Sequence, residues 1–190
     1  MRYGNALLAL VGVLAVPCLS SCGQDAAAAQ TGVDVVKRGA YLAAYGGCGD
    51  CHTPKIMTPQ GPVPDTTRTL SGHPAAMTTA PVPAGLLSPT GWTAATTGDL
   101  TAWVGPWGVS FAANLTPDST GLAVWTEQAF IATMRTGKHF GIGRPVLPPM
   151  PWYDVAALTD DDLRALFAYL RTVKPVHNEV PGPLPPPGAR

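Results

Sequence analysis

The chain has 190 residues, in which 12 Lys and Arg balance 12 Asp and Glu, and its mean hydropathy is +0.14. The balanced charge gives no basic excess for nucleic acid, and the 46% hydrophobic content excludes a disordered polyelectrolyte. The mean hydropathy argues against an integral membrane protein, and the length suits one compact domain. The 21 prolines and 21 glycines predict many turns and few helices.

The first 21 residues have the pattern of an export signal. Arg2 precedes an apolar run over 6–16, which is too short to span a bilayer as a helix. Leu19-Ser20-Ser21-Cys22 resembles a bacterial lipobox, in which Cys22 is lipidated and becomes the mature N-terminus. Cleavage within 26–29, giving a soluble secreted protein, is the competing interpretation. We expect a lipoprotein-type signal peptide over 1–21, a linker over 22–32, and an exported protein anchored on the periplasmic side of the membrane.

A Cys-x-x-Cys-His string follows the first predicted helix. That helix begins near Asp34, a good N-cap residue, and ends at Gly46-Gly47. Next comes Cys48-Gly49-Asp50-Cys51-His52, in which two thiols share one helical turn and can each bond a haem vinyl group. The histidine that follows then ligates the iron. A thioredoxin-like redox pair would need a βαβ context, and a zinc site would need a second Cys/His pair. The sequence therefore predicts one covalent haem c.

Residues 53–113 have a different composition. They contain nine prolines, seven glycines and only four charged residues, and most of the stretch shows no helical period. They also contain four large aromatic residues, which are too many for a free linker: Trp92, Trp103, Trp107 and Phe111. We expect an ordered, loop-rich insertion wrapped over the haem domain, with room for a short hairpin that the sequence does not place.

Two further helices are predicted after the insertion. Thr126 caps the first, which carries apolar residues and ends at Gly137. Thr159 caps the second, which has an acidic first turn and ends before Pro175. We expect a cytochrome domain over 33–178 and an extended, mobile Pro-rich tail over 179–190. There is no internal repeat and only one Cys-x-x-Cys-His string, so a second haem is not expected.

The second axial ligand decides the chemistry of the iron. A methionine raises the reduction potential, whereas an open position allows ligand binding or peroxide chemistry. The candidates outside the signal are Met57, Met77, Met134, Met150, His73, His139 and His177. Met134 has a core position in its helix, and Met57 is too near His52 in sequence to reach the opposite haem face easily. Met150 lies among prolines that stiffen the backbone, so we predict that His52 and Met150 are the metal ligands, the alternative being a packed surface methionine.

Two runs carry a family resemblance: Gly39-Ala40-Tyr41-Leu42 before the haem motif, and 166–170 near the end. With them, the sequence resembles class I c-type cytochromes over nearly all of the mature chain. The resemblance implies an N-terminal helix leading into the haem motif, a later loop supplying the axial methionine, and a C-terminal helix crossing the first. Gly39 would allow a close crossing against Tyr169. The expected fold class is mainly α, a class I cytochrome c-like domain around one haem, with the long Pro/Gly-rich insertion.

Four further runs are similar to the cytochrome domains of membrane-bound bacterial dehydrogenases: 114–118, 120–126, 135–137 and 149–151. This likeness makes Met150 the sixth ligand and makes Trp125, Asn114 and Arg144 candidates for the haem propionate edge, where donors and positive charge offset carboxylates. The structural alternatives for these three residues are capping, packing and solvation. The insertion is a departure from the family pattern, because it places Met150 98 residues after His52.

The expected function is electron transfer, relaying single electrons between a dehydrogenase or other donor and a respiratory acceptor such as an oxidase or a cytochrome. Such a carrier is not by itself an enzyme and has no catalytic residues, although it can be a subunit of an oxidoreductase complex. The alternative is a haem enzyme or ligand sensor with an open or displaceable sixth site, in which His73 is a distal acid or base or a competing ligand. For His73 a turn near the surface is the simpler interpretation. In a third interpretation, the aromatic insertion docks a larger complex and the haem serves as a relay.

Overall fold

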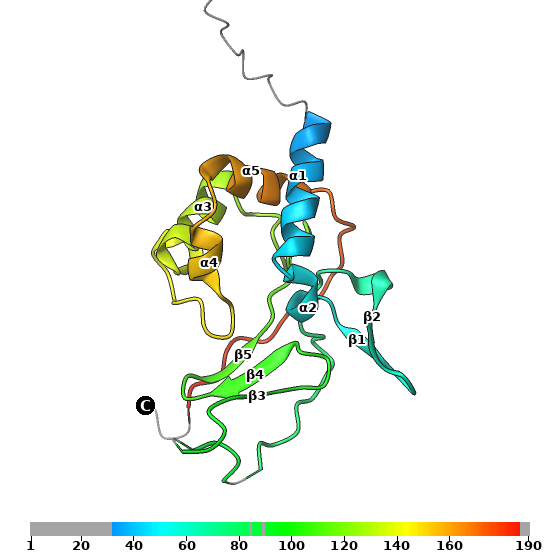
Figure 1. Cartoon of the computed structure of the whole chain (residues 1–190), viewed down its shortest axis with the longest axis vertical. Helices are drawn as coiled ribbons and strands as arrows, with labels where there is room; N and C mark the ends of the chain where they lie inside the picture. Colours follow the sequence, from blue (N-terminus) through cyan, green and yellow to red (C-terminus); the bar gives the residue numbers. More distant parts are fainter. Residues whose placement is uncertain (1–31, 84, 89, 187–190) are drawn as a thin grey trace, which may run out of the picture.

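The computed structural model describes residues 32–83, 85–88 and 90–186 (Figure 1). The predictions for the signal peptide and for lipid attachment at Cys22 lie outside the described residues. Helices gather at one end of the molecule and a three-stranded sheet lies at the other, with the helix of the haem motif between them. None of the described helices combines the length and apolar character that crossing a membrane requires.

The predicted helices are present, and two short ones join them. Their bounds are α1 (Gly32–Tyr45), α2 (Cys48–His52), α3 (Glu127–Thr136), α4 (Trp152–Ala156) and α5 (Asp160–Leu170). The two predicted caps of α3 and α5 are confirmed, because Thr126 Oγ1 and Thr159 Oγ1 each accept from a backbone N–H three residues on, both at 3.1 Å. Helix α1 begins at Gly32, two residues before Asp34, so Asp34 lies in its first turn. The haem motif itself is helix α2.

The hydrophobic core lies where α1 crosses α5 and α3 packs against them. Its centre is a set of buried apolar side chains, which includes Leu42, Phe130, Leu163, Leu166 and Leu170. A Cβ atom on Gly39 would lie 1.9 Å from the Ala165 carbonyl oxygen and 2.7 Å from Tyr169 Cβ. The predicted close crossing of Gly39 against Tyr169 is therefore confirmed, and only a residue without a side chain fits there.

The insertion over 53–113 contains strands that the sequence does not place. An antiparallel hairpin joins β1 (Lys55–Thr58) to β2 (Gly61–Pro64), and a 3₁₀ turn (Thr66–Arg68) follows. A three-stranded antiparallel sheet has the order β3 (Ala95–Thr96), β4 (Ala102–Gly105), β5 (Gly108–Phe111). A mainly α fold class is thus too simple, because two small sheets accompany the helices. Strands of two to four residues are too short to display a period of two in the sequence.

The Pro-rich tail lies along the edge of this sheet. The backbone N–H of Val109 donates to the carbonyl of Leu184 at 2.8 Å, and the reverse bond is 2.9 Å long. A Cβ atom on Gly108 would lie 2.0 Å from the Leu184 oxygen, so the glycine lets the tail approach. The described part of the tail contains no helix, and these two hydrogen bonds attach it to β5.

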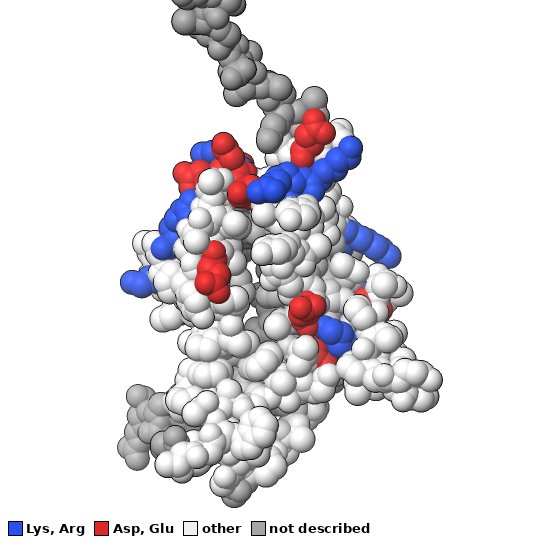
Figure 2. All heavy atoms as spheres, viewed as in Figure 1, with Lys and Arg blue, Asp and Glu red and all other residues white. Residues whose placement is uncertain are grey.

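Charged side chains are unevenly distributed over the molecule. In Figure 2 they gather over the helical end, whereas the surface around the three-stranded sheet is almost free of them. Between residues 69 and 113 the sequence has a single charged residue, Asp99, and its side chain is buried. The two ends of the molecule therefore offer different surfaces, one charged and one neutral.

Candidate functional site

Helix α2 presents the two cysteines on one side of a single turn. Cys48 and Cys51 are both free thiols and half-buried, and Cys48 packs against the hydrophobic core. Burial raises the pKa of the Cys48 thiol, and it also raises the pKa of the Cys51 thiol although the nearby Lys55 ammonium opposes the change. Residues three apart on a helix share a face, so the two sulfur atoms can bond one ligand lying against that face.

Lys55 closes the C-terminal end of α2. Its ammonium donates to the carbonyl oxygens of Asp50 and Thr53 at 2.5 and 2.6 Å and lies 3.4 Å from that of Gly49. The Gly49 carbonyl also accepts from the Thr53 N–H at 3.1 Å, and a positive charge at a helix C-terminus is favourable. The cation on β1 thus fixes the turn that carries the cysteines.

The His52 imidazole is oriented by a backbone carbonyl. Its Nδ1 lies 2.7 Å from the carbonyl oxygen of Ala113. A carbonyl can only accept, so Nδ1 carries the proton and Nε2 keeps its lone pair for a metal. Burial lowers the pKa of His52, which favours the neutral imidazole that iron requires.

Gly72 lets the Ala113 carbonyl reach His52. Its N–H donates to the His52 carbonyl at 2.8 Å, and its φ is +79°. A Cβ atom on Gly72 would lie 2.5 Å from the Ala112 oxygen and 2.7 Å from the Ala113 oxygen. The sequence signals for this arrangement are weak, because Ala113 acts through its backbone and Gly72 reads only as part of a turn.

Met150 lies in the loop between α3 and α4. The residue is half-buried, its N–H donates to the Leu147 carbonyl at 3.3 Å, and its carbonyl accepts from the Trp152 N–H at 2.9 Å. The loop extends from the helical end towards β5 (Figure 1), where Ser110 Oγ donates to the Pro148 carbonyl at 2.5 Å. Ligation of iron by Met150 stays a prediction.

Trp125 and Arg144 are brought into one neighbourhood by the 3₁₀ turn η2 (His139–Gly141). The Trp125 ring stacks on Phe140 at 4.2 Å between centroids and meets His139 edge-on at 5.9 Å. The pKa of His139 is lowered, first by burial and then by the positive charge of Arg144. In the described part of the chain the Arg144 guanidinium has no carboxylate partner. This cluster therefore keeps a positive charge available for an anionic group.

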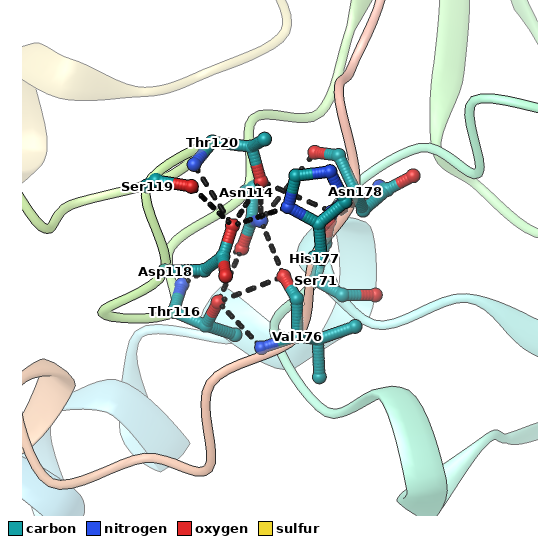
Figure 3. A network of polar contacts seen from close by, with 9 residues as sticks. All are labelled: Ser71, Asn114, Thr116, Asp118, Ser119, Thr120, Val176, His177 and Asn178. Carbon is teal, nitrogen blue, oxygen red and sulfur yellow. Dashed lines mark hydrogen bonds and ion pairs between the residues drawn. The ribbon is translucent and has the colours of Figure 1, made fainter.

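Asn114 belongs to a different network, which joins the 114–120 loop to the segment after α5 (Figure 3). Its Nδ2 donates to Thr120 Oγ1 at 3.0 Å and to the Val176 carbonyl at 2.9 Å, and its Oδ1 accepts from Thr116 Oγ1 at 2.7 Å. Asn114 is only 4% exposed. Both of its amide protons are therefore engaged within the protein, and its predicted role at the propionate edge stays untested.

His73 is fully buried, so the interpretation of this residue as part of a surface turn is wrong. Its N–H donates to the Ala112 carbonyl at 2.8 Å, and its Nδ1 lies 2.8 Å from Thr101 Oγ1. His73 is thus bonded to the residue that precedes the carbonyl contacting His52 Nδ1. Its own Nε2 has no hydrogen-bond partner in the described structure.

The remaining ligand candidates have other surroundings. Met134 packs against the core, as predicted. Met57 on β1 is 64% exposed and Met77 is 39% exposed. The exposed His177 contacts Asp118 at 3.2 Å.

Comparison with known proteins gives a consistent set of relatives. The chain is 30% identical over 178 residues, 93% of its length, to the cytochrome c subunit of the quinone-dependent alcohol dehydrogenase of Gluconobacter oxydans. It is 29% identical over 157 residues to the gluconate 2-dehydrogenase cytochrome c subunit of Pantoea cypripedii, and 36% identical over 80 residues to the fructose dehydrogenase cytochrome subunit of Gluconobacter japonicus. The chain is a homologue of the cytochrome c subunits of bacterial dehydrogenases. The predicted resemblance is thus confirmed.

The chain spans less than a third of the length of each of these relatives. It spans 28% of the alcohol dehydrogenase subunit, 27% of the gluconate dehydrogenase subunit and 16% of the fructose dehydrogenase subunit. These matches cover 93%, 79% and 41% of this chain, respectively. No family model matches the chain.

The residues present fit a haem c group. Two unpaired thiols lie three positions apart on α2, and the adjacent imidazole has its Nδ1 proton engaged and its Nε2 lone pair available. The half-buried His52, whose pKa is lowered by burial and whose Nδ1 is bonded to a carbonyl, matches what an axial ligand needs.

Proposed function

We propose that this chain is an exported carrier of single electrons, with one haem c bonded to Cys48 and Cys51 and with iron held by His52 and Met150. The observation that carries the proposal is the 2.7 Å contact between His52 Nδ1 and the Ala113 carbonyl, next to two free thiols on one helical turn. Such an outer hydrogen bond fixes the ring of a metal-bound histidine and raises its basicity. The homologous cytochrome c subunits support a haem c cofactor and an electron-transfer role.

A haem c group would supply a centre that gains and loses one electron. The residues of the chain hold it and tune it. Cys48 and Cys51 would hold it covalently, His52 would ligate the iron through Nε2 while its Nδ1 donates to the Ala113 carbonyl, and a methionine sulfur as the second ligand would favour the ferrous state. We propose that Trp125 and Arg144 lie near the propionates, and that Asn114, whose amide protons are already bonded, has a structural role there.

We propose that the redox partners are a dehydrogenase as donor and a respiratory oxidase or cytochrome as acceptor. The three relatives are named as cytochrome subunits of dehydrogenases, which supports a donor of this class. We further propose export, with Cys22 carrying a lipid anchor on the periplasmic side. Small, transient interfaces suit electron exchange between such proteins.

The alternative of a haem enzyme or sensor with an open sixth site gains no support from His73. That residue is fully buried, with its N–H bonded to the Ala112 carbonyl and its Nδ1 2.8 Å from Thr101 Oγ1. A distal acid or base would have to come from elsewhere in the chain.

The proposal is tested with the full chain, produced in a host that assembles c-type cytochromes. We expect a coloured protein with the mass of the polypeptide plus one haem, and loss of covalent haem in the Cys48→Ser/Cys51→Ser double variant. The ferric protein should show the weak red charge-transfer band of methionine–iron ligation. That band should disappear in Met150→Ala and persist in the control Met134→Ala. A colourless protein would overturn the proposal, and a band that survives Met150→Ala would overturn the ligation by Met150.

A further inference from the structure

We propose that Ser110 on β5 is a positioning residue for the Met150 loop, and that its strand holds the segments of both axial ligands in one frame. This inference rests on the proposed function, because it takes Met150 as the second ligand of the iron. It gives the long insertion a role in the haem site, although none of the predicted ligands lies within it.

The Ser110 hydroxyl has a defined direction. The indole N–H of Trp107 can only donate, and it lies 3.2 Å from Ser110 Oγ. The serine oxygen therefore accepts from Trp107, and its own proton goes to the Pro148 carbonyl at 2.5 Å. Pro148 stands two residues before Met150. The hydroxyl thus connects β5 to the backbone of the methionine loop.

The Trp107 indole, which donates to Ser110, is itself held in place. A Cβ atom on Gly105 would lie 2.4 Å from the Trp107 ring, so the ring is packed flat against the turn between β4 and β5. Ser110 is opposite Trp103 in the sheet, and it is only 8% exposed. The Ser110 hydroxyl therefore has little access to water, and its hydrogen bond to the Pro148 carbonyl is partly buried.

The same strand leads to the support of His52. Three residues after Ser110, the Ala113 carbonyl accepts from His52 Nδ1, and three residues of extended chain span roughly 10 Å. Between them, Ala112 is bonded on both sides, because its N–H donates to the Thr101 carbonyl and its carbonyl accepts from the His73 N–H, both at 2.8 Å.

A buried side-chain network supports this brace. His73 Nδ1 lies 2.8 Å from Thr101 Oγ1, which donates to Asp99 Oδ2 at 2.7 Å. All three side chains are buried. The stretch 110–113 is therefore held in place at the end that supports His52. Through its hydrogen bond to the Pro148 carbonyl, Ser110 also holds the Met150 loop against this stretch.

Loss of the Ser110 hydroxyl should loosen the Met150 side of the iron and leave the His52 side unchanged. The test uses the haem-loaded full chain and compares Ser110→Ala with Ser110→Thr, which keeps the hydroxyl and suits a strand. Imidazole is added to the ferric protein, and its binding displaces the methionine and removes the red band. We expect about tenfold tighter apparent imidazole binding in Ser110→Ala, because a net hydrogen bond of about 1.4 kcal/mol corresponds to a factor of ten. Ser110→Thr should keep the methionine ligated, so that its apparent imidazole affinity equals that of the unmodified protein.

Two further variants separate the specific effect from a general one. Trp107→Phe replaces the indole with a smaller aromatic ring that has no N–H, so we expect a smaller change of about threefold, consistent with one weaker hydrogen bond. Ser119→Ala, at an exposed serine whose hydroxyl makes a 3.4 Å contact with Asp118, should leave imidazole binding unchanged. The thermal midpoint of each variant, measured in the ferrous protein, shows whether the whole fold has weakened.

The failure of this inference differs from the failure of the proposed function. If the red band is present and depends on Met150, and Ser110→Ala binds imidazole like the unmodified protein, the positioning role is overturned. Equal binding by Ser110→Ala and Ser110→Thr would overturn it as well. If haem is bound but the unmodified protein lacks the band, ligation by Met150 fails and Ser110 has no such role.

Discussion

The α carbon of Gly72 lies so close to the carbonyl of Ala113 that a Cβ atom there would come within 2.7 Å of the Ala113 oxygen. That oxygen accepts the hydrogen bond from His52 Nδ1. Gly72 also donates its own N–H to the His52 carbonyl at 2.8 Å. A residue with no side chain thus joins the backbone of the haem motif to the carbonyl that orients its histidine.

Gly72→Ala should weaken the hydrogen bond at His52. The added methyl pushes the Ala113 carbonyl away, so the imidazole becomes a poorer electron donor and the reduction potential rises. The alanine also has to adopt a φ of +79°, and overpacking adds to this strain, so we expect a loss of about 1–3 kcal/mol in the free energy of unfolding. Redox titration and denaturant unfolding measure the two effects.

Gly85→Ala is the matched control for Gly72→Ala. Gly85 has a φ of +78°, and a Cβ atom there would meet nothing within 4 Å. The control shares the backbone strain but lacks the clash, so it should leave the reduction potential unchanged. If both variants shift the potential equally, the contact with the Ala113 carbonyl is not the cause.

Gly39→Ala tests the crossing of α1 and α5. The new methyl carbon would lie 1.9 Å from the Ala165 carbonyl oxygen, which is far inside van der Waals contact, so the two helices have to separate. We expect destabilisation by about 1–3 kcal/mol from overpacking, although alanine favours a helix more than glycine does. Gly32→Ala, at the open start of α1 with nothing within 4 Å, should be neutral or slightly stabilising. A Gly39→Ala protein with unchanged thermal stability would contradict the tight crossing.

Acid should weaken the network between the 114–120 loop and the segment after α5. Hydrogen bonds from Thr120 and contact with His177 lower the pKa of Asp118 to about 2, from an ordinary value of 3.8. A depressed folded-state pKa contributes stability above the unfolded-state pKa and loses it as the pH falls towards 2. Asp118→Asn should therefore lower the free energy of unfolding at pH 6 and flatten its decline between pH 4 and 2. Asp161→Asn, whose side chain is 89% exposed, should keep the original acid profile in urea titrations.

Some parts of this molecule were predictable because side chains carry the signal. The spacing of Cys48, Cys51 and His52 predicts the haem motif. Likewise, Thr126 and Thr159 predict helix starts from the residues that directly follow them. The caps and the haem-motif helix lie where that spacing puts them. The ligation chemistry of the motif still awaits its spectroscopic test.

The supports of the site could not be predicted because they act through the backbone or across long separations. Ala113 and Pro148 contribute carbonyl groups, which every residue has, and their partners are 61 and 38 residues away. Burial of His73 depends on how the insertion folds, and its flanking Gly72 and Pro74 read only as turn residues. The short strands of the insertion are recognisable only from their pairing.

Arg144→Gln should lower the reduction potential without changing stability. The guanidinium has no carboxylate partner in the described part of the chain, so its positive charge is free to oppose the ferric state, which carries one more positive charge than the ferrous state. Lys138→Gln removes the same charge from a second exposed side chain, which does not contribute to the lowered pKa of His139, so we expect a smaller shift in potential. Asn114→Ala should show the reverse pattern, because it leaves buried partners unsatisfied and costs about 1–3 kcal/mol of stability, with the potential unchanged. Redox titrations at low and high salt, paired with unfolding curves, measure all three variants. Equal shifts in Arg144→Gln and Lys138→Gln would mean that only net charge acts and that Arg144 is not at the propionate edge.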